Sequence, residues 1–199
     1  MTETLFVRHG ETAWNAEGRI QGWAPVPLSD RGRTEAAEVG ASLAARHDVD
    51  AVVSSDLVRA LETAEAIADA ADVDVETDRR LRERDFGSYQ GLRSTGFFER
   101  FPEMDLLENG ADAAAYTPES AESWLDVRER VLAAADDLLD REGTVVAVTH
   151  VNPIRLVVGE ARGFDVVRAL TDLSFDNCSV TAVDVADGVV RENGTDHRS

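Results

Sequence analysis

The sequence of 199 residues contains no lysine. All 20 of its basic side chains are therefore arginines, against 39 acidic ones, which gives a formal net charge of −19. A surface this negative repels nucleic acids and anionic membranes, because proteins that bind them contact phosphates through lysine and arginine. We therefore expect neither nucleic acid nor membrane as a partner.

Isoleucine is scarce as well, at positions 20, 67 and 154 alone, whereas Asp, Glu and Ala are abundant. One explanation is simple solubility. The other is adaptation to a cytoplasm with very high salt, where counter-ions screen such a charge density. The missing lysine favours the second, halophilic explanation.

The sequence has no apolar run near the roughly 18 residues that a membrane helix needs. Its start, Met1-Thr2-Glu3-Thr4, is acidic and does not resemble a secretory signal. The only cysteine, Cys178, has no partner for an internal disulfide. We therefore expect a cytoplasmic protein.

Apolar residues make up 43% of the chain, which is enough for a real core. Strands are predicted at 5–7, 51–53, 73–76 and 144–148. Helices are predicted over 30–46 and 57–71, from Thr117-Pro118 to 139, and from Asn152-Pro153 to about 159–163. A hairpin is predicted between 180–185 and 189–190, across an Asp187-Gly188 turn.

This alternation predicts a three-layer α/β/α sandwich with a mostly parallel central sheet and an antiparallel edge hairpin. Residues 93–117 fit the alternation poorly, and we expect them to form a small lid insertion over the site. The whole chain, 1–199, is predicted to be a single domain.

Polar residues follow three of the predicted strands. Arg8 and His9 end the first, Arg59 lies one turn into the helix after the second, and His150 ends the fourth. In an open α/β sheet, ligands bind outside the carboxyl ends of the strands. A lone histidine in such a place is usually structural, but two, each near an arginine, favour a site.

Such a set suits phosphoryl transfer. Arginine donates in a planar fork that matches phosphate oxygens, and a neutral imidazole can take the phosphoryl group covalently. A nearby carboxylic acid would protonate the leaving alkoxide. This pattern predicts a phosphatase without a metal.

The sequence resembles the histidine phosphatase superfamily, in its phosphoglycerate-mutase-like branch. The similar segments are 5–15 (from Leu5 to Asn15, including Arg8-His9-Gly10), 18–23, 27–29 with Gly32, 54–64, 81–91, Glu122-Ser123 with Arg130-Val131, and 146–150. They extend over nearly the whole chain, and the first is highly specific.

The resemblance implies a role for each matching residue. His9 would become phosphohistidine, and Glu83 would protonate the leaving oxygen and then activate water. The residues implied for binding the phosphoryl group or the substrate are Arg8, Arg59 and His150, with Asn15 assisting and Gln21 at the rim. From the residues alone, Glu83 does not stand out among the other glutamates.

The sequence departs from the family after the second histidine, where Val151-Asn152 replaces the usual Gly-Gly. We expect Val151 to narrow the pocket. An arginine cluster around Glu83 is either a solvated face or a contact for a second anionic group of the substrate; its members are Arg79, Arg80, Arg82, Arg84 and Arg93.

We therefore expect a metal-independent phosphomonoesterase that acts on a small phosphorylated metabolite through a phosphohistidine intermediate. The alternatives are a phosphoglycerate mutase and a non-catalytic phosphate-binding module. A zinc site of His9, His150 and Glu83 is disfavoured, because Arg8 and Arg59 would repel the cation. No cofactor is expected, and the protein is expected to be a monomer or homodimer.

Overall fold

The computed structural model describes residues 3–184, 189–192 and 195–196. Across these residues, seven strands form one sheet in the order β3-β2-β4-β1-β5-β6-β7. The first four in this order are parallel, and the last three are antiparallel. The strands are β1 (Glu3–Arg8), β2 (Val49–Ser54), β3 (Val75–Thr77), β4 (Thr144–Thr149), β5 (Val180–Asp184), β6 (Val189–Glu192) and β7 (Thr195–Asp196).

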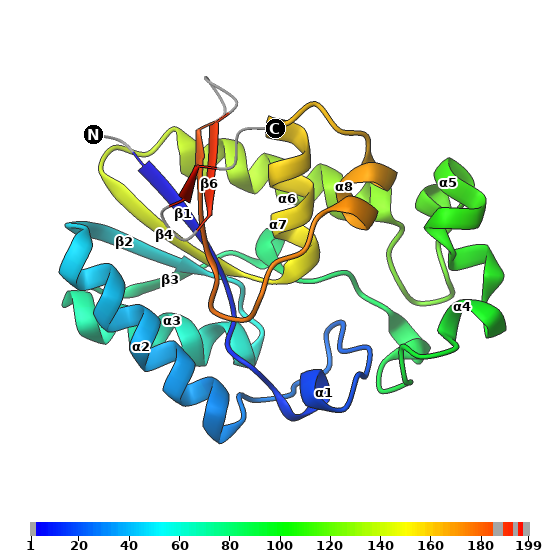
Figure 1. Ribbon diagram of the computed structural model, residues 1–199, viewed down its shortest axis with the longest axis horizontal. Coiled ribbons are helices and arrows are strands. Elements are labelled where there is room, and N and C mark those ends of the chain that lie inside the picture. The colour runs from blue at the N-terminus through cyan, green and yellow to red at the C-terminus, as the bar shows by residue number, and fades with distance from the viewer. Residues whose placement is uncertain (1–2, 185–188, 193–194, 197–199) are drawn as a thin grey trace.

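Helices cover both faces of the sheet, with α2 and α3 on one side and α6, α7 and α8 on the other (Figure 1). The helices are α1 (Ala13–Ala16), α2 (Asp30–Arg46), α3 (Val58–Ala71), α4 (Phe97–Arg100), α5 (Leu106–Ala115), α6 (Trp124–Leu139), α7 (Val151–Ala161) and α8 (Val166–Asp172). Three short 3-10 turns lie at Arg79–Leu81, Gly87–Tyr89 and Pro102–Met104. The predicted three-layer architecture is confirmed.

Alternation along the central strands explains the two cores. In β1, Leu5 and Val7 pack in the core beneath α2 and α3, whereas Phe6 packs in the core beneath α6 and α7. β4 is apolar on both faces, since Val146 and Val148 join the first core and its other apolar residues the second. This is what a central parallel strand requires.

The long helix α6 begins later than the sequence predicted. Thr117-Pro118 does not cap it; the N-cap is Ser123, whose hydroxyl accepts the Asp126 N–H while the Asp126 carboxylate accepts the Ser123 N–H. This reciprocal capping box fixes the start. Ser120 lies in the left-handed region with φ of 58°, so the helix cannot extend back through it.

Helix α7 begins earlier than predicted, because Asn152-Pro153 does not cap it. His150, at the end of β4, is its N-cap, and Asn152 and Pro153 lie in its first turn. Proline is tolerated there because the first N–H groups of a helix have no partner within the helix. The Asn152 side chain is therefore available for another contact.

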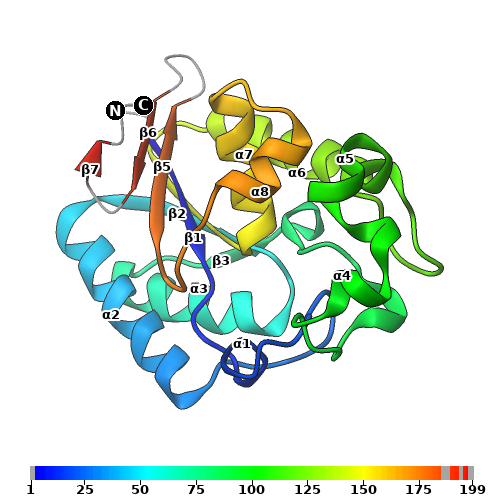
Figure 2. The ribbon, with the colours of Figure 1, turned by 45° about the vertical axis from the view of Figure 1, so that its right-hand side comes forward.

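Residues 93–117 form α4, a short turn and α5 at one end of the molecule, where α5 packs against α6 and α8 (Figure 2). Their role as a lid stays a prediction. The β5–β6 pair is antiparallel as predicted, while its Asp187-Gly188 turn lies outside the described residues. Among the described helices, none combines the length and apolarity needed to cross a membrane.

Candidate active site

The carboxyl ends of β1, β2 and β4 bring two histidines and an arginine into one buried group. The rings of His9 and His150 lie edge to face with centroids 5.1 Å apart. His9, Arg59 and His150 are 3%, 1% and 0% exposed. Three segments far apart in the sequence thus converge where the topology predicts a ligand site.

His9 is held in a defined orientation and tautomer. Its Nδ1 lies 2.7 Å from the Gly10 carbonyl oxygen, which can only accept, so Nδ1 carries the proton. Its unprotonated Nε2 accepts a hydrogen bond of 3.2 Å from Arg59 Nε with its lone pair. Burial lowers the pKa of His9 well below its ordinary value, and the charges of Arg59 and Arg8 lower it further. His9 is therefore neutral at physiological pH.

The backbone of His9 and of the next residue, Gly10, is held by hydrogen bonds and close packing. Thr63 Oγ1 accepts the Gly10 N–H, and Asn177 Nδ2 donates to the His9 carbonyl oxygen over 2.8 Å. A Cβ at Gly10 would lie only 2.5 Å from the Gly32 carbonyl oxygen, so only glycine fits here. The nucleophile candidate thus sits on rigid backbone.

Arg59 is fixed by three hydrogen bonds. Besides His9, it donates to the carbonyl oxygens of Gly22, at 2.8 Å, and Ala24, at 3.2 Å. Burial lowers its pKa to about 10, an effect that Glu83 opposes and Arg8 reinforces. The guanidinium is still charged at neutral pH, with no carboxylate bonded to it among the described residues.

Two nitrogens beside this group are buried without a hydrogen-bond partner in the described part of the chain. They are Arg8 Nε and His150 Nδ1. Arg8 Nη1 donates to the Phe175 carbonyl oxygen, and His150 Nε2 forms a hydrogen bond with Ser55 Oγ over 2.9 Å. Buried polar atoms are rarely left unpaired, so both nitrogens point to a ligand with oxygen atoms.

Glu83 lies on the loop after β3 and is 6% exposed. Its Oε1 accepts the Arg84 N–H at 2.8 Å and the Asn152 Nδ2 at 3.0 Å. Asn152 Oδ1 in turn accepts from Arg155 Nη1 at 3.0 Å. Asn152, which replaces a glycine usual in the similar family, therefore holds the carboxylate that the resemblance singled out.

The loop that carries Glu83 is held from outside by Arg130. This guanidinium donates to the carbonyl oxygens of Arg80, Arg82 and Glu83 and pairs with the Glu122 carboxylate. In the sequence, Arg130 stands out only as part of the helix motif Arg130-Val131; its place beside the apolar residues of a predicted helix is the signal that points to this role.

The two remaining predicted residues, Asn15 and Gln21, make side-chain hydrogen bonds to Thr12 and none to His9, Arg59 or His150 among the described residues. Gln21 Oε1 accepts from Thr12 Oγ1, and Asn15 Oδ1 accepts the Thr12 N–H in a capping box for α1. The Asn15 amide nitrogen makes no hydrogen bond to the residues that the structure describes. Roles for Asn15 and Gln21 in binding stay predictions.

The sequence model of the histidine phosphatase superfamily (branch 1) matches residues 4–194. The chain belongs to this superfamily. Phosphoglycerate mutase-like protein 4 of Arabidopsis thaliana is 38% identical over 80% of this chain and 71% of the relative. Glucosyl-3-phosphoglycerate phosphatase of Mycolicibacterium vanbaalenii is 35% identical over 88% and 77%. A mycobacterial glucosyl-3-phosphoglycerate phosphatase, solved in complex with VO3, superposes with a TM-score of 0.80 at 26% identity over 100% of both chains.

The arginine cluster of this superfamily member divides into two kinds. Arg80 and Arg82 pair with Asp78 and Asp56, so they are structural. Arg84 is buried, with its guanidinium 4.5 Å from the Trp124 ring centroid. Burial lowers the Arg84 pKa to about 10. Arg84 lines a cavity together with Arg155, a residue that the sequence did not single out.

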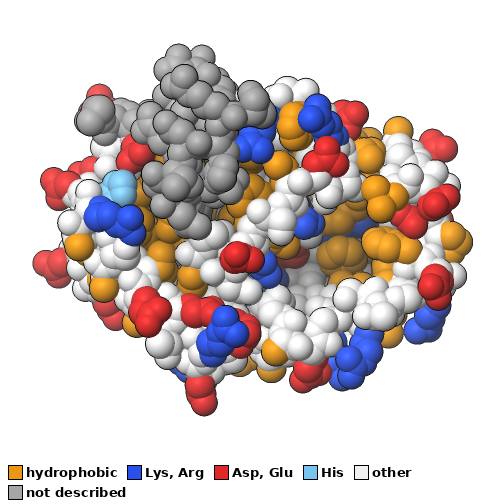
Figure 3. Space-filling view, viewed as in Figure 1, with side chains coloured by type: hydrophobic (Ala, Val, Ile, Leu, Met, Phe, Trp, Pro, Cys, Tyr) orange, Lys and Arg blue, Asp and Glu red, His pale blue; other side chains and the backbone are white. Residues whose placement is uncertain are grey.

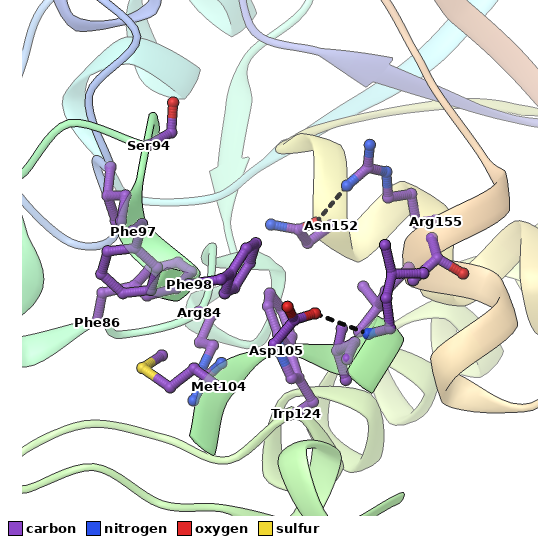
Figure 4. A pocket seen from close by; sticks show the side chains of 15 residues that line it. Arg84, Phe86, Ser94, Phe97, Phe98, Met104, Asp105, Trp124, Asn152 and Arg155 are labelled. Carbon is purple, nitrogen blue, oxygen red and sulfur yellow. Dashed lines mark hydrogen bonds between the residues drawn. The ribbon is translucent and has the colours of Figure 1, made fainter. Parts of the chain in front are cut away.

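That cavity, of about 400 Å³, opens beside Asn152 and beneath residues 93–117. Figure 3 shows a hollow in this face, with hydrophobic side chains along its right-hand wall. Figure 4 shows Asn152 at its edge, bonded to Arg155 and facing Phe98. Val151 packs against the core and does not line this cavity, and its expected narrowing of the pocket beside His150 stays a prediction.

Proposed function

We propose that this chain hydrolyses phosphate monoesters through a phosphohistidine intermediate on His9. One observation carries the proposal: a neutral histidine whose Nδ1 proton is fixed on Gly10 and whose unprotonated Nε2 is oriented by the Arg59 guanidinium, in a site where two further nitrogens, Arg8 Nε and His150 Nδ1, are buried without a partner among the described residues. A nitrogen lone pair held in this way is a competent nucleophile.

In the first step, His9 Nε2 attacks phosphorus and the P–O bond to the alcohol breaks. Arg8, Arg59 and His150 bind the phosphoryl oxygens and stabilise their negative charge. Arg59 exchanges its bond to His9 Nε2 for a phosphoryl oxygen. Glu83, protonated, gives its proton to the leaving alkoxide.

In the second step, the Glu83 carboxylate takes a proton from water, and the hydroxide attacks phosphorus. The P–N bond breaks, which releases phosphate and restores His9. Asn152 holds Glu83 in place through both steps, because its amide donates to Oε1. Positive charge comes from arginine throughout, so the reaction needs no metal.

The alternative within the superfamily is a phosphoglycerate mutase. A mutase must shield phosphohistidine from water and clamp a substrate carboxylate. Residues 93–117, the material available for a lid, carry five acidic side chains against two arginines: Glu99, Glu103, Asp105, Glu108 and Asp112, with Arg93 and Arg100. This charge opposes a doubly anionic phosphoglycerate.

The test is to incubate the purified protein with 3-phosphoglycerate and a bisphosphoglycerate primer, and with generic phosphate esters. We expect phosphate release that needs no primer and survives a strong chelator. Formation of 2-phosphoglycerate that outpaces phosphate release would establish the mutase. No turnover of any ester would establish a binding module.

We further propose a halophilic, cytoplasmic protein, in keeping with the charge of −19 and the absence of lysine.

A further inference from the structure

The cavity beside Glu83 is lined mainly by apolar side chains, and nine of its fifteen lining residues are apolar. Aromatic rings dominate one wall, where Phe86, Phe97 and Phe98 stand near Trp124 (Figure 4). Its volume of about 400 Å³ falls in the range of small-molecule sites, roughly 300–1,000 Å³.

The cavity and the proton donor share a boundary. Asn152 lines the cavity and donates to Glu83 Oε1, and Arg84, the residue after Glu83, forms part of the wall. A phosphoryl group on His9 with its leaving oxygen at Glu83 therefore directs the rest of the alcohol toward this cavity.

Each polar lining residue has at least one partner inside the protein, although Arg155 Nε is buried with no hydrogen-bond partner among the described residues. Their bonds are Arg84 to the Glu122 carbonyl, Ser94 to the Gly18 carbonyl, Asp105 to the Leu107 N–H, Asn152 to Glu83, Arg155 to Asn152 and Thr171 to the Val167 carbonyl. A polyol or sugar would find few groups left to replace its lost hydrogen bonds to water, which is costly.

We infer that this cavity is the leaving-group subsite and that it selects monoesters of apolar or aromatic alcohols. The inference rests on the proposed function and narrows it. An aromatic ring gains by packing among the phenylalanines that line the wall.

Two primary alkyl esters provide the test, because their leaving groups have the same chemistry. We expect kcat/KM for 2-phenylethyl phosphate to exceed that for ethyl phosphate by at least about tenfold, the scale on which apolar pockets discriminate. A ratio near one, with both esters turned over, would overturn the subsite while leaving the phosphatase intact.

Variants locate the effect. Phe98 is 48% exposed, so Phe98→Ser should fold, and we expect it to lower the ratio at least about threefold. Leu107→Ser, at a lining residue that is 80% exposed, should also lower it. The matched control is Leu125→Ser, equally exposed at 48% but outside the cavity, which should leave the ratio unchanged. An unchanged ratio in both cavity variants would contradict the assignment.

Binding of 1-naphthol, followed by tryptophan fluorescence, separates the two proposals. If no ester is hydrolysed but naphthol binds and Phe98→Ser weakens the binding, the proposed function fails and the subsite stands. If esters are hydrolysed and naphthol does not bind, the subsite fails and the phosphatase stands.

Discussion

Two neighbouring regions of this protein differ in how they are built. The phosphoryl end, around His9 and His150, lies on the strand ends, is almost wholly buried and has each side chain fixed by hydrogen bonds. The cavity end is walled partly by the short helices α4 and α5, where Phe98 and Leu107 remain exposed. The difference suggests that the residues at the strand ends carry out the phosphoryl transfer, and that the segment with α4 and α5 determines which substrates are selected.

Removing the nucleophile should have the largest effect. We expect His9→Ala to lower kcat at least about a thousandfold for every ester, because the covalent step contributes several kcal/mol. The control is His47→Ala, at the end of α2, which should retain full activity. A His9→Ala enzyme above about a thousandth of the original rate would exclude a covalent role.

Asn152 joins the two regions, and its loss should have an intermediate effect that depends on the leaving group. We expect Asn152→Ala to lower kcat about tenfold for ethyl phosphate but less than about threefold for p-nitrophenyl phosphate, since a good leaving group needs little protonation. Glu83→Gln should show the same pattern more strongly. Equal losses on both esters would mean that Asn152 acts on structure alone.

The protonation state of His9 offers a test without substrate. Burial and the charges of Arg59 and Arg8 lower the pKa of His9, so His9 should keep its neutral form, with the proton on Nδ1, to a lower pH than a free imidazole does. Nitrogen-15 spectra of the imidazole report this directly. Protonation with a midpoint near 6.5 would show that burial and the arginines do not control the group.

Features of the fold and the site could be predicted from the sequence where they depend on neighbouring residues, and not where they depend on contacts between distant ones. Strand ends and their polar residues could be predicted because period and burial are local properties. The start of α6 could not, since Ser123 and Thr117 are both good N-caps and the left-handed Ser120 decides between them. The bond from Asn152 to Glu83 was equally hidden, because it joins residues 69 positions apart.

The smallest expected effect is that of salt on thermal stability, which depends on the net charge of the whole chain. We expect the melting temperature to rise between about 0.1 M and 3 M potassium chloride, because salt screens the mutual repulsion of a chain with net charge −19. Sodium perchlorate, which is weakly excluded from protein surfaces, should stabilise too if screening is the cause. An unchanged melting temperature would contradict adaptation to salt.

The central claim is that His9 carries the phosphoryl group, and rapid quenching tests it most directly. The enzyme is mixed with phosphorus-32-labelled ester, quenched within milliseconds and digested to map the label. We predict acid-labile, base-stable label on the peptide that contains His9, absent in His9→Ala. Turnover with no label on the protein, or with label on another residue, would contradict the account.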